Sequence, residues 1–224
     1  ICDVEVSVPV SPVLALNPVN EVAFVNIAKD SAYAENIAIE SVAFELYSNS
    51  GLHDIVSAEL LDKERANVPI AGETFELSRG RKSYKVELAL GSAVVVTSSD
   101  TAKLVVSLRL RDSIDMCGKI TFKPLFVKTD KGKIMLPDTL SKELSFGVAL
   151  RQKMQDGVAS RIPGLATTKK GTLIAIYDGR VGRYRDLQGD MDICVNRSTD
   201  GGATWSSMTK AIDMGEWGGL PQKY

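Results

Sequence analysis

The stretch that decides the fold runs from residue 161 to residue 205 and reads RIPGLATTKKGTLIAIYDGRVGRYRDLQGDMDICVNRSTDGGATW. It opens with the triplet Arg-Ile-Pro at 161–163, which enters a strand that ends at Asp-Gly-Arg, 178–180. Residues 172–178 are nearly continuously apolar and residues 191–197 alternate between apolar and polar, and both patterns are typical of β-strands. The stretch closes with the spacing S-x-D-x-G-x-x-W at 198–205, which predicts a tight turn between strands.

Upstream of this stretch, short alternating segments predict more strands. Residues 83–90, for example, place Tyr84, Val86, Leu88 and Leu90 on one face and polar side chains on the other. Residues 53–62 fit either a strand or a short helix. Many short strands separated by turn residues indicate an antiparallel β-sandwich. The expected strands are 3–10, 21–28, 38–48, 83–90, 102–111, 119–127, 132–136 and 143–149.

A change of character at residues 150–160, LRQKMQDGVAS, predicts a domain boundary. The apolar alternation stops there, and polar and small residues dominate. We therefore expect a β-sandwich domain over residues 1–149 and a second domain over residues 150–224.

The composition excludes several classes of partner and cofactor. The 224 residues include 27 basic and 28 acidic side chains, with a net charge of −1, so neither nucleic acid nor an anionic membrane is an expected partner. No apolar run is long enough to span a membrane. His53 is the only histidine, which excludes a multi-histidine metal site, and we expect no metal and no cofactor.

The cysteines and the first residues bear on localisation. Cys2, Cys117 and Cys194 lack the spacing of a zinc site or of a disulfide framework. The chain begins Ile-Cys-Asp without an initiator Met, so we expect an exported protein whose signal peptide is not part of this sequence. Cys2 fits either a lipid-carrying cysteine of a lipoprotein or an ordinary thiol, and the sequence favours the thiol.

Residues 151–224 resemble the start of the catalytic domain of bacterial sialidases (exo-α-neuraminidases), a family of Asp-box, or BNR-repeat, propellers. In that family an Arg-Ile-Pro arginine opens a six-bladed β-propeller, and a strand ending in D-x-R and an Asp box follow in this order. The upstream part resembles, more weakly, the N-terminal β-domain of some sialidases of gut-type bacteria. The resemblance implies an all-β chain, in which an antiparallel sandwich precedes the first, truncated propeller blade.

The resemblance also assigns roles to two arginines. Sialic acid carries a carboxylate on its anomeric carbon, and the planar guanidinium of arginine donates two parallel hydrogen bonds to such a group. Arg161 corresponds to the first of three arginines that clamp this carboxylate. Arg180, which lies 19 residues further on, corresponds to an arginine that reaches sugar hydroxyls or a neighbouring acid. A purely structural pairing of Arg180 with Asp178 or Asp186 fits the sequence equally well.

The expected acid/base residue is Asp186. In the family this aspartate lies on a loop about 25 residues after the first arginine, and Asp186 lies 25 residues after Arg161. Its role is to protonate the leaving glycosidic oxygen and then to deprotonate the incoming water. Asp190 is a close alternative if the loop register shifts. Asp192 lies within a predicted strand, which favours a structural role.

The Asp box is expected to be structural. Asp200 can accept hydrogen bonds from backbone N–H groups, Gly202 permits a tight turn, and Trp205 is expected to anchor the strands. The motif, which begins at Ser198, also occurs in propellers that are not sialidases.

The resemblance places the remaining catalytic groups after residue 224. These are the nucleophilic tyrosine that sialidases use in place of a carboxylate, its glutamate partner and two further clamp arginines. Tyr177, Tyr184 and Tyr224 do not match the nucleophile position. A blade takes roughly 40–50 residues, so residues 150–224 cover one blade and part of a second. We therefore expect an N-terminal fragment, inactive alone, that needs the remainder of the propeller from the same polypeptide or a second chain.

The function that follows from the resemblance is a retaining exo-α-sialidase that acts on sialylated glycoproteins, glycolipids or oligosaccharides. One alternative is a non-catalytic carbohydrate-binding or adhesion protein with an Asp-box propeller. Another is an Asp-box glycosidase for neutral polysaccharides, which has no use for Arg161. The N-terminal domain either binds glycans, with Tyr33, Tyr47 and Tyr84 as candidates, or buttresses the propeller, which its few exposed aromatics favour.

Overall fold

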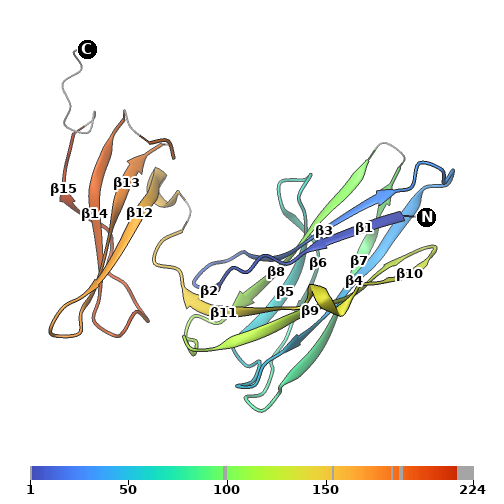
Figure 1. Cartoon of the computed structure of the whole chain (residues 1–224), viewed down its shortest axis with the longest axis horizontal. Helices are drawn as coiled ribbons and strands as arrows, with labels where there is room; N and C mark the ends of the chain where they lie inside the picture. The colour runs from blue at the N-terminus through green and yellow to red at the C-terminus, as the bar shows by residue number, and fades with distance from the viewer. Residues whose placement is uncertain (1, 98–99, 153, 183, 187–188, 216–224) are drawn as a thin grey trace. The chain divides into compact units, whose positions relative to one another are not determined.

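The computed structural model describes residues 2–97, 100–152, 154–182, 184–186 and 189–215 (Figure 1). Over these residues the chain is built of β-strands and two short 3₁₀ helices, η1 (Asp138–Leu140) and η2 (Gln155–Gly157). No helix of this described part is long and apolar enough to cross a membrane. The chain divides into two compact units, Ile1–Gly147 and Val148–Tyr224.

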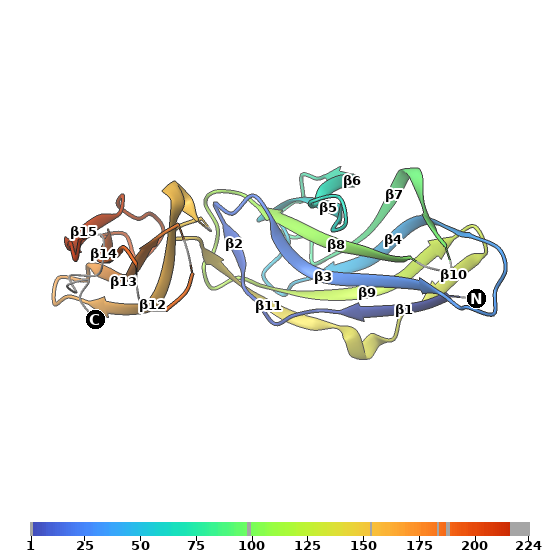
Figure 2. The same ribbon diagram turned by 90° about the horizontal axis from the view of Figure 1, so that it is seen from above.

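The first unit is a sandwich of two antiparallel sheets, whose longer strands run lengthwise along it (Figure 2). One sheet has the order β1-β3-β8-β5-β6, and the other has the order β2-β11-β9-β4-β7, with β10 paired to β9. The strands are β1 (Cys2–Ser7), β2 (Val13–Ala15), β3 (Asn20–Lys29), β4 (Ile37–Tyr47), β5 (Ile55–Asp62), β6 (Val68–Thr74), β7 (Ser83–Val96), β8 (Thr101–Leu110), β9 (Lys119–Thr129), β10 (Gly132–Met135) and β11 (Lys142–Val148).

The core of this unit comes from the alternate positions of its strands. Phe44 on β4 and Phe122 on β9 are buried and stacked, with ring centroids 4.8 Å apart, and Ile27 and Leu60 supply fully buried aliphatic groups from the other sheet. The buried Asn20 of β3 exchanges hydrogen bonds with the backbone of Leu14 in β2, which belongs to the opposite sheet. Because a buried amide must be satisfied, this side chain fixes where the two sheets meet.

The second unit contains one four-stranded antiparallel sheet of the order β12-β13-β14-β15. Its strands are β12 (Val158–Thr167), β13 (Leu173–Val181), β14 (Met191–Ser198) and β15 (Thr209–Ile212). Such an up-and-down sheet is the repeating unit of a β-propeller. The all-β fold class expected from the sequence, a sandwich followed by propeller-type strands, is confirmed.

Three details of the strand prediction were wrong or incomplete. Residues 161–180 do not form one strand, because a turn at 168–172, where Thr168 and Gly171 hydrogen-bond within the turn, separates β12 from β13. The strands β2 and β6 were not predicted from the alternation of apolar and polar residues, because β2 is only three residues long and β6 contains Pro69 and Gly72. β6 lies at a sheet edge, where proline is tolerated. The ambiguous segment 53–62 forms strand β5.

A β-bulge interrupts β12 next to Arg161. Arg161 pairs with Asp178 and Gly164 pairs with Ile176, so two residues of β12 oppose the single Tyr177 of β13. Within the bulge, Ile162 has a φ of 53° and is 64% exposed. The left-handed region costs an L-residue about 1–2 kcal/mol. Because the Ile162 side chain is largely exposed, its packing offsets little of that cost. The strain is therefore stored in the residue next to Arg161.

This strain predicts an unusual response to glycine. Ile162→Gly is expected to leave the free energy of unfolding of the second unit unchanged or to raise it by about 1 kcal/mol, because glycine adopts a positive φ freely. The control is Ile212→Gly, which removes a 54% exposed side chain from β15. It is expected to lower that free energy by roughly 1 kcal/mol. Urea unfolding followed by tryptophan fluorescence measures both, since the two tryptophans, Trp205 and Trp217, lie in the second unit. Equal losses in the two variants would contradict the strain.

Candidate functional site

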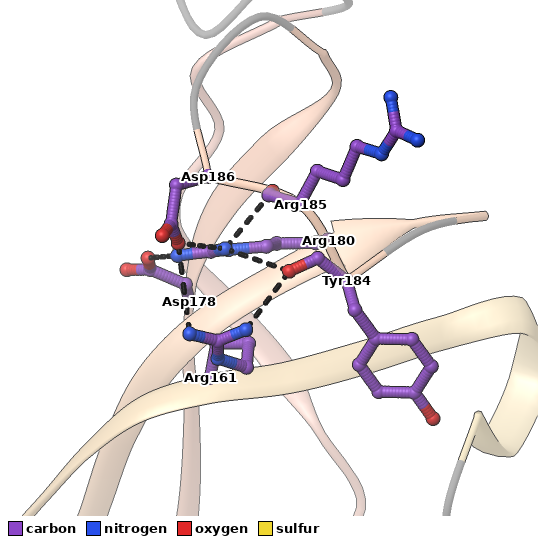
Figure 3. A network of polar contacts seen from close by, with 6 residues as sticks. All are labelled: Arg161, Asp178, Arg180, Tyr184, Arg185 and Asp186. Carbon is purple, nitrogen blue, oxygen red and sulfur yellow. Dashed lines mark hydrogen bonds and ion pairs between the residues drawn. The ribbon is translucent and has the colours of Figure 1, made fainter.

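A polar cluster lies at one end of the sheet of the second unit (Figure 3). Arg161 comes from β12, Asp178 and Arg180 come from β13, and residues 184–186 come from the loop that follows β13. The antiparallel register places Arg161 directly opposite Asp178, and alternation along β13 puts Asp178 and Arg180 on one face of the sheet. The loop then brings Asp186 back toward both arginines.

Arg180 lies at the centre of the cluster, and its side chain is only 4% exposed. Its Nη2 donates to Asp178 Oδ2 at 2.9 Å, and its Nη1 donates to Asp186 Oδ1 at 2.6 Å. Nη1 also donates to the carbonyl oxygens of Tyr184 and Arg185, at 3.1 and 2.9 Å. The hydrogen bonds with Asp178, and then those with Asp186, raise the pKa of Arg180 above its ordinary value. This one guanidinium therefore ties the loop to the strand.

Arg161 is less buried and less occupied. Its side chain is 39% exposed, its Nη1 donates to the carbonyl oxygen of Tyr184 at 3.0 Å, and its Nη2 lies 3.7 Å from Asp186 Oδ1. The second distance is that of an ion pair without a direct hydrogen bond. A half-exposed guanidinium beside a loop can take an external anion without loss of a buried contact.

Asp186 is exposed and is held as an anion. Its side chain is 68% exposed. The hydrogen bond and charge of Arg180, followed by the charge of Arg161, lower its pKa below the ordinary range. At neutral pH the carboxylate is therefore ionised in the ligand-free chain, whereas a general acid must carry a proton when its reaction begins.

The two alternative aspartates occupy different surroundings. Asp192 is buried, lies 2.5 Å from Lys210 Nζ and accepts a hydrogen bond from the Met214 N–H at 2.9 Å. Burial alone would raise the pKa of Asp192, but Lys210 and the Met214 N–H outweigh burial and lower it. Asp190 is half-buried, and its carbonyl accepts from the Val181 N–H. Asp192 on β14 is thus bound to Lys210 on β15 and to the backbone of Met214, and its carboxylate is engaged in these contacts.

Two tyrosines near the cluster also have defined environments. Tyr177 is buried, and its hydroxyl donates to Asn196 Oδ1 at 2.5 Å. Tyr184 contributes its carbonyl oxygen to both arginines while its side chain remains part-exposed. Tyr224 lies outside the described residues. The sequence left open a structural pairing of Arg180 with Asp178 or Asp186, and the structure shows Arg180 bonded to both carboxylates.

The Asp box lies at the opposite end of the same sheet. Ser198, where it begins, pairs with Leu173, whereas Arg180 pairs with Met191, so about 7 residues or ~24 Å of strand separate the box from the arginines. Asp200 accepts from the Ser198 hydroxyl at 2.7 Å and from the Thr204 N–H at 3.0 Å. The Gly202 N–H donates to Ser198 Oγ, and Trp205 Nε1 donates to the Gly202 carbonyl. These bonds close the turn between β14 and β15.

The Asp box predicts a measurable acid limit. The hydroxyl and N–H of Thr204, then the Ser198 hydroxyl, lower the pKa of Asp200 from 3.8 to about 2. A lowered folded pKa contributes stability that is present above pH 3.8 and is lost as the pH falls through about 2. Carboxyl NMR titration is expected to give that midpoint, and Asp200→Asn is expected to flatten the pH dependence of unfolding in this range. A midpoint near 3.8 would show that the hydrogen bonds do not form in solution.

Comparison with known proteins finds similar sialidases both by sequence and by structure. No family model matches the chain. A sialidase of Bacteroides fragilis (strain YCH46) is 41% identical over 120 residues, which are 52% of this chain and 22% of that protein. The anhydrosialidase of Macrobdella decora is 39% identical over 57 residues, which are 25% of this chain and 8% of that protein. The chain thus spans less than a quarter of either curated relative.

A solved structure, the Hadza microbial sialidase Hz136, matches with a TM-score of 0.73. The match covers 96% of this chain and 45% of the solved one, at 24% sequence identity. At this identity the match establishes the fold: both units of this chain fall within one architecture that the solved structure shares.

Proposed function

Starting from a chain that is sialidase-like in sequence and fold, we propose that it forms part of a retaining exo-α-sialidase, which releases terminal sialic acids from glycoconjugates. The observation that carries this proposal is the contact between Arg161 and Asp186 at one end of the sheet of the second unit. Cleavage of a sialoside requires a guanidinium to bind the carboxylate of the substrate and, next to it, a carboxyl group to transfer the proton. The similarity to the Bacteroides fragilis sialidase supports the substrate class.

Arg161 is the proposed carboxylate-binding residue. The anomeric carbon of sialic acid bears a carboxylate, and a partly exposed guanidinium offers it two N–H groups in a planar fork. Arg180 has a different role, because its buried side chain already serves four acceptors and binds the acid's loop.

Asp186 is the proposed acid/base residue. As the glycosidic C–O bond breaks, the proton of Asp186 passes to the departing oxygen, and the carboxylate then accepts a proton from the water that releases the sugar. Sialidases use a tyrosine nucleophile. Tyr177 is unsuited to that role because it is buried and bonded to Asn196. We propose that the remainder of the propeller supplies the nucleophile and that the 224-residue chain alone does not turn over.

The first unit is proposed to buttress the propeller. Tyr84 packs against Phe75 at 5.3 Å and its hydroxyl donates to Glu73, so the face of this candidate is already used. Tyr33 bonds weakly to Glu35, and Tyr47, which is 43% exposed, donates to Asn49. The proposed substrates are sialylated glycoproteins, glycolipids or oligosaccharides met outside the cytoplasm by an exported protein.

The role of Asp186 is tested in the longer protein that contains this chain. With a fluorogenic α-sialoside, Asp186→Ala is expected to lower kcat by about 100- to 10,000-fold, because general acid catalysis is lost. The matched control is Asp190→Ala, which removes a carboxylate four residues away and is expected to leave kcat within a factor of about 3. A large loss in Asp190→Ala with none in Asp186→Ala would reassign the acid. Binding without turnover in the unaltered protein would support the carbohydrate-binding alternative.

The role of Arg161 is tested by charge removal. Arg161→Gln is expected to lower kcat/KM for the sialoside roughly 100-fold, because a charge-assisted, paired hydrogen bond to the carboxylate disappears. Arg197→Gln, at an exposed position on β14 of the same sheet, is the control and is expected to leave kcat/KM unchanged. Full activity of Arg161→Gln would indicate a substrate without a carboxylate, such as a neutral polysaccharide.

A further inference from the structure

Arg161 and Arg180 share the same two acceptors (Figure 3). Asp186 Oδ1 lies 2.6 Å from Arg180 Nη1 and 3.7 Å from Arg161 Nη2. The carbonyl oxygen of Tyr184 lies 3.1 Å from Arg180 Nη1 and 3.0 Å from Arg161 Nη1. The carboxylate of Asp186 therefore already lies beside one of the two nitrogens with which Arg161 would bind a carboxylate ligand.

The two arginines hold Asp186 with different strength. Arg180 is 4% exposed and makes a short hydrogen bond to it, supported by Asp178 on the other nitrogen. Arg161 is 39% exposed, and its longer contact to Asp186 is an ion pair near the surface. Exposed ion pairs contribute little and exchange easily, whereas the loss of a partner of a buried charge is costly. An incoming anion therefore replaces the contact with Arg161 before the contact with Arg180.

We propose that Asp186 is an internal competitor for Arg161. A carboxylate ligand that binds Arg161 replaces the ion pair between Arg161 and Asp186, while Asp186 remains hydrogen-bonded to Arg180, a positioning residue. The identity of the ligand as sialic acid rests on the proposed function. The exchange itself requires only a carboxylate.

The exchange changes the protonation of Asp186. Among the described residues, the charged groups that act on Asp186 are Arg180 from β13 and Arg161 from β12, and Asp178 on β13 is paired to the same guanidinium of Arg180. Arg180, and then Arg161, lower the pKa of Asp186 in the ligand-free chain. When a ligand carboxylate neutralises Arg161 and adds its own negative charge nearby, the pKa of Asp186 rises, and the group takes up a proton from solvent more readily. Ligand binding thus favours the protonated form of Asp186, which is the form that a general acid needs.

The competition is tested by ligand affinity in the 224-residue chain. At neutral pH, titration with sodium acetate and with N-acetylneuraminic acid, followed by NMR, is expected to show binding that Arg161→Gln abolishes. Asp186→Asn removes the competing anion and is expected to tighten both ligands about two- to fivefold, as for loss of a surface ion pair. Arg197→Gln is the matched control and is expected to change neither affinity. Equal or weaker binding by Asp186→Asn would overturn the proposal.

The coupling to protonation is tested by the carboxyl NMR titration of Asp186. Sodium trifluoroacetate, a carboxylate that stays ionised at low pH, is expected to raise the pKa of Asp186 by about half a unit or more above that in sodium chloride of equal ionic strength. In Arg161→Gln the pKa is expected to start higher and to show no such difference. The same difference with and without Arg161 would overturn the proposal. If the exchange is seen with acetate and trifluoroacetate but the longer protein that contains this chain does not cleave sialosides, the exchange stands and the proposed function is rejected.

Discussion

The arrangement of the polar cluster depends on the hydrogen bonds that the buried guanidinium of Arg180 makes to the loop after β13. A buried charge is costly unless it is paired. Although the Nε of Arg180 is buried without a hydrogen-bond partner among the described residues, its two terminal nitrogens are paired with one carboxylate from its strand and three acceptors from the loop. The loop conformation at 184–186 is consequently set by a side chain that precedes it. Without the Arg180 side chain, the hydrogen bonds that hold Asp186 and the Tyr184 carbonyl next to Arg161 would be lost.

The sheet of the second unit separates stability from chemistry. At one end, the Asp box closes the turn between β14 and β15 with bonds among Ser198, Asp200, Gly202 and Thr204. At the other end, the strained bulge at Ile162 and the loop after β13 hold the charged residues.

Similarity and geometry support each other at different levels. The relatives found by sequence are sialidases, and the solved structure fixes the architecture of both units. The geometry adds what similarity does not supply, namely that the two arginines are unequal in burial and in the number of their partners. The two arginines, for which different roles are proposed, therefore differ in their surroundings as well.

Much of the fold was determined by the sequence alone, because it is written in short-range patterns. Alternation of period two produced most of the strands, and the Asp-box spacing predicted its turn correctly. Short or proline-bearing strands such as β2 and β6 carry too few residues for any period to show. Arg161, Arg180 and Asp186 were singled out in the sequence through the resemblance to the sialidase family, and the structure brings these three side chains together. Only the tertiary structure decided that Asp186 contacts both arginines, that Asp178 pairs with Arg180 and that a bulge interrupts β12 next to Arg161. The physical reason is that strand register and loop closure depend on pairings between distant residues that no local pattern encodes.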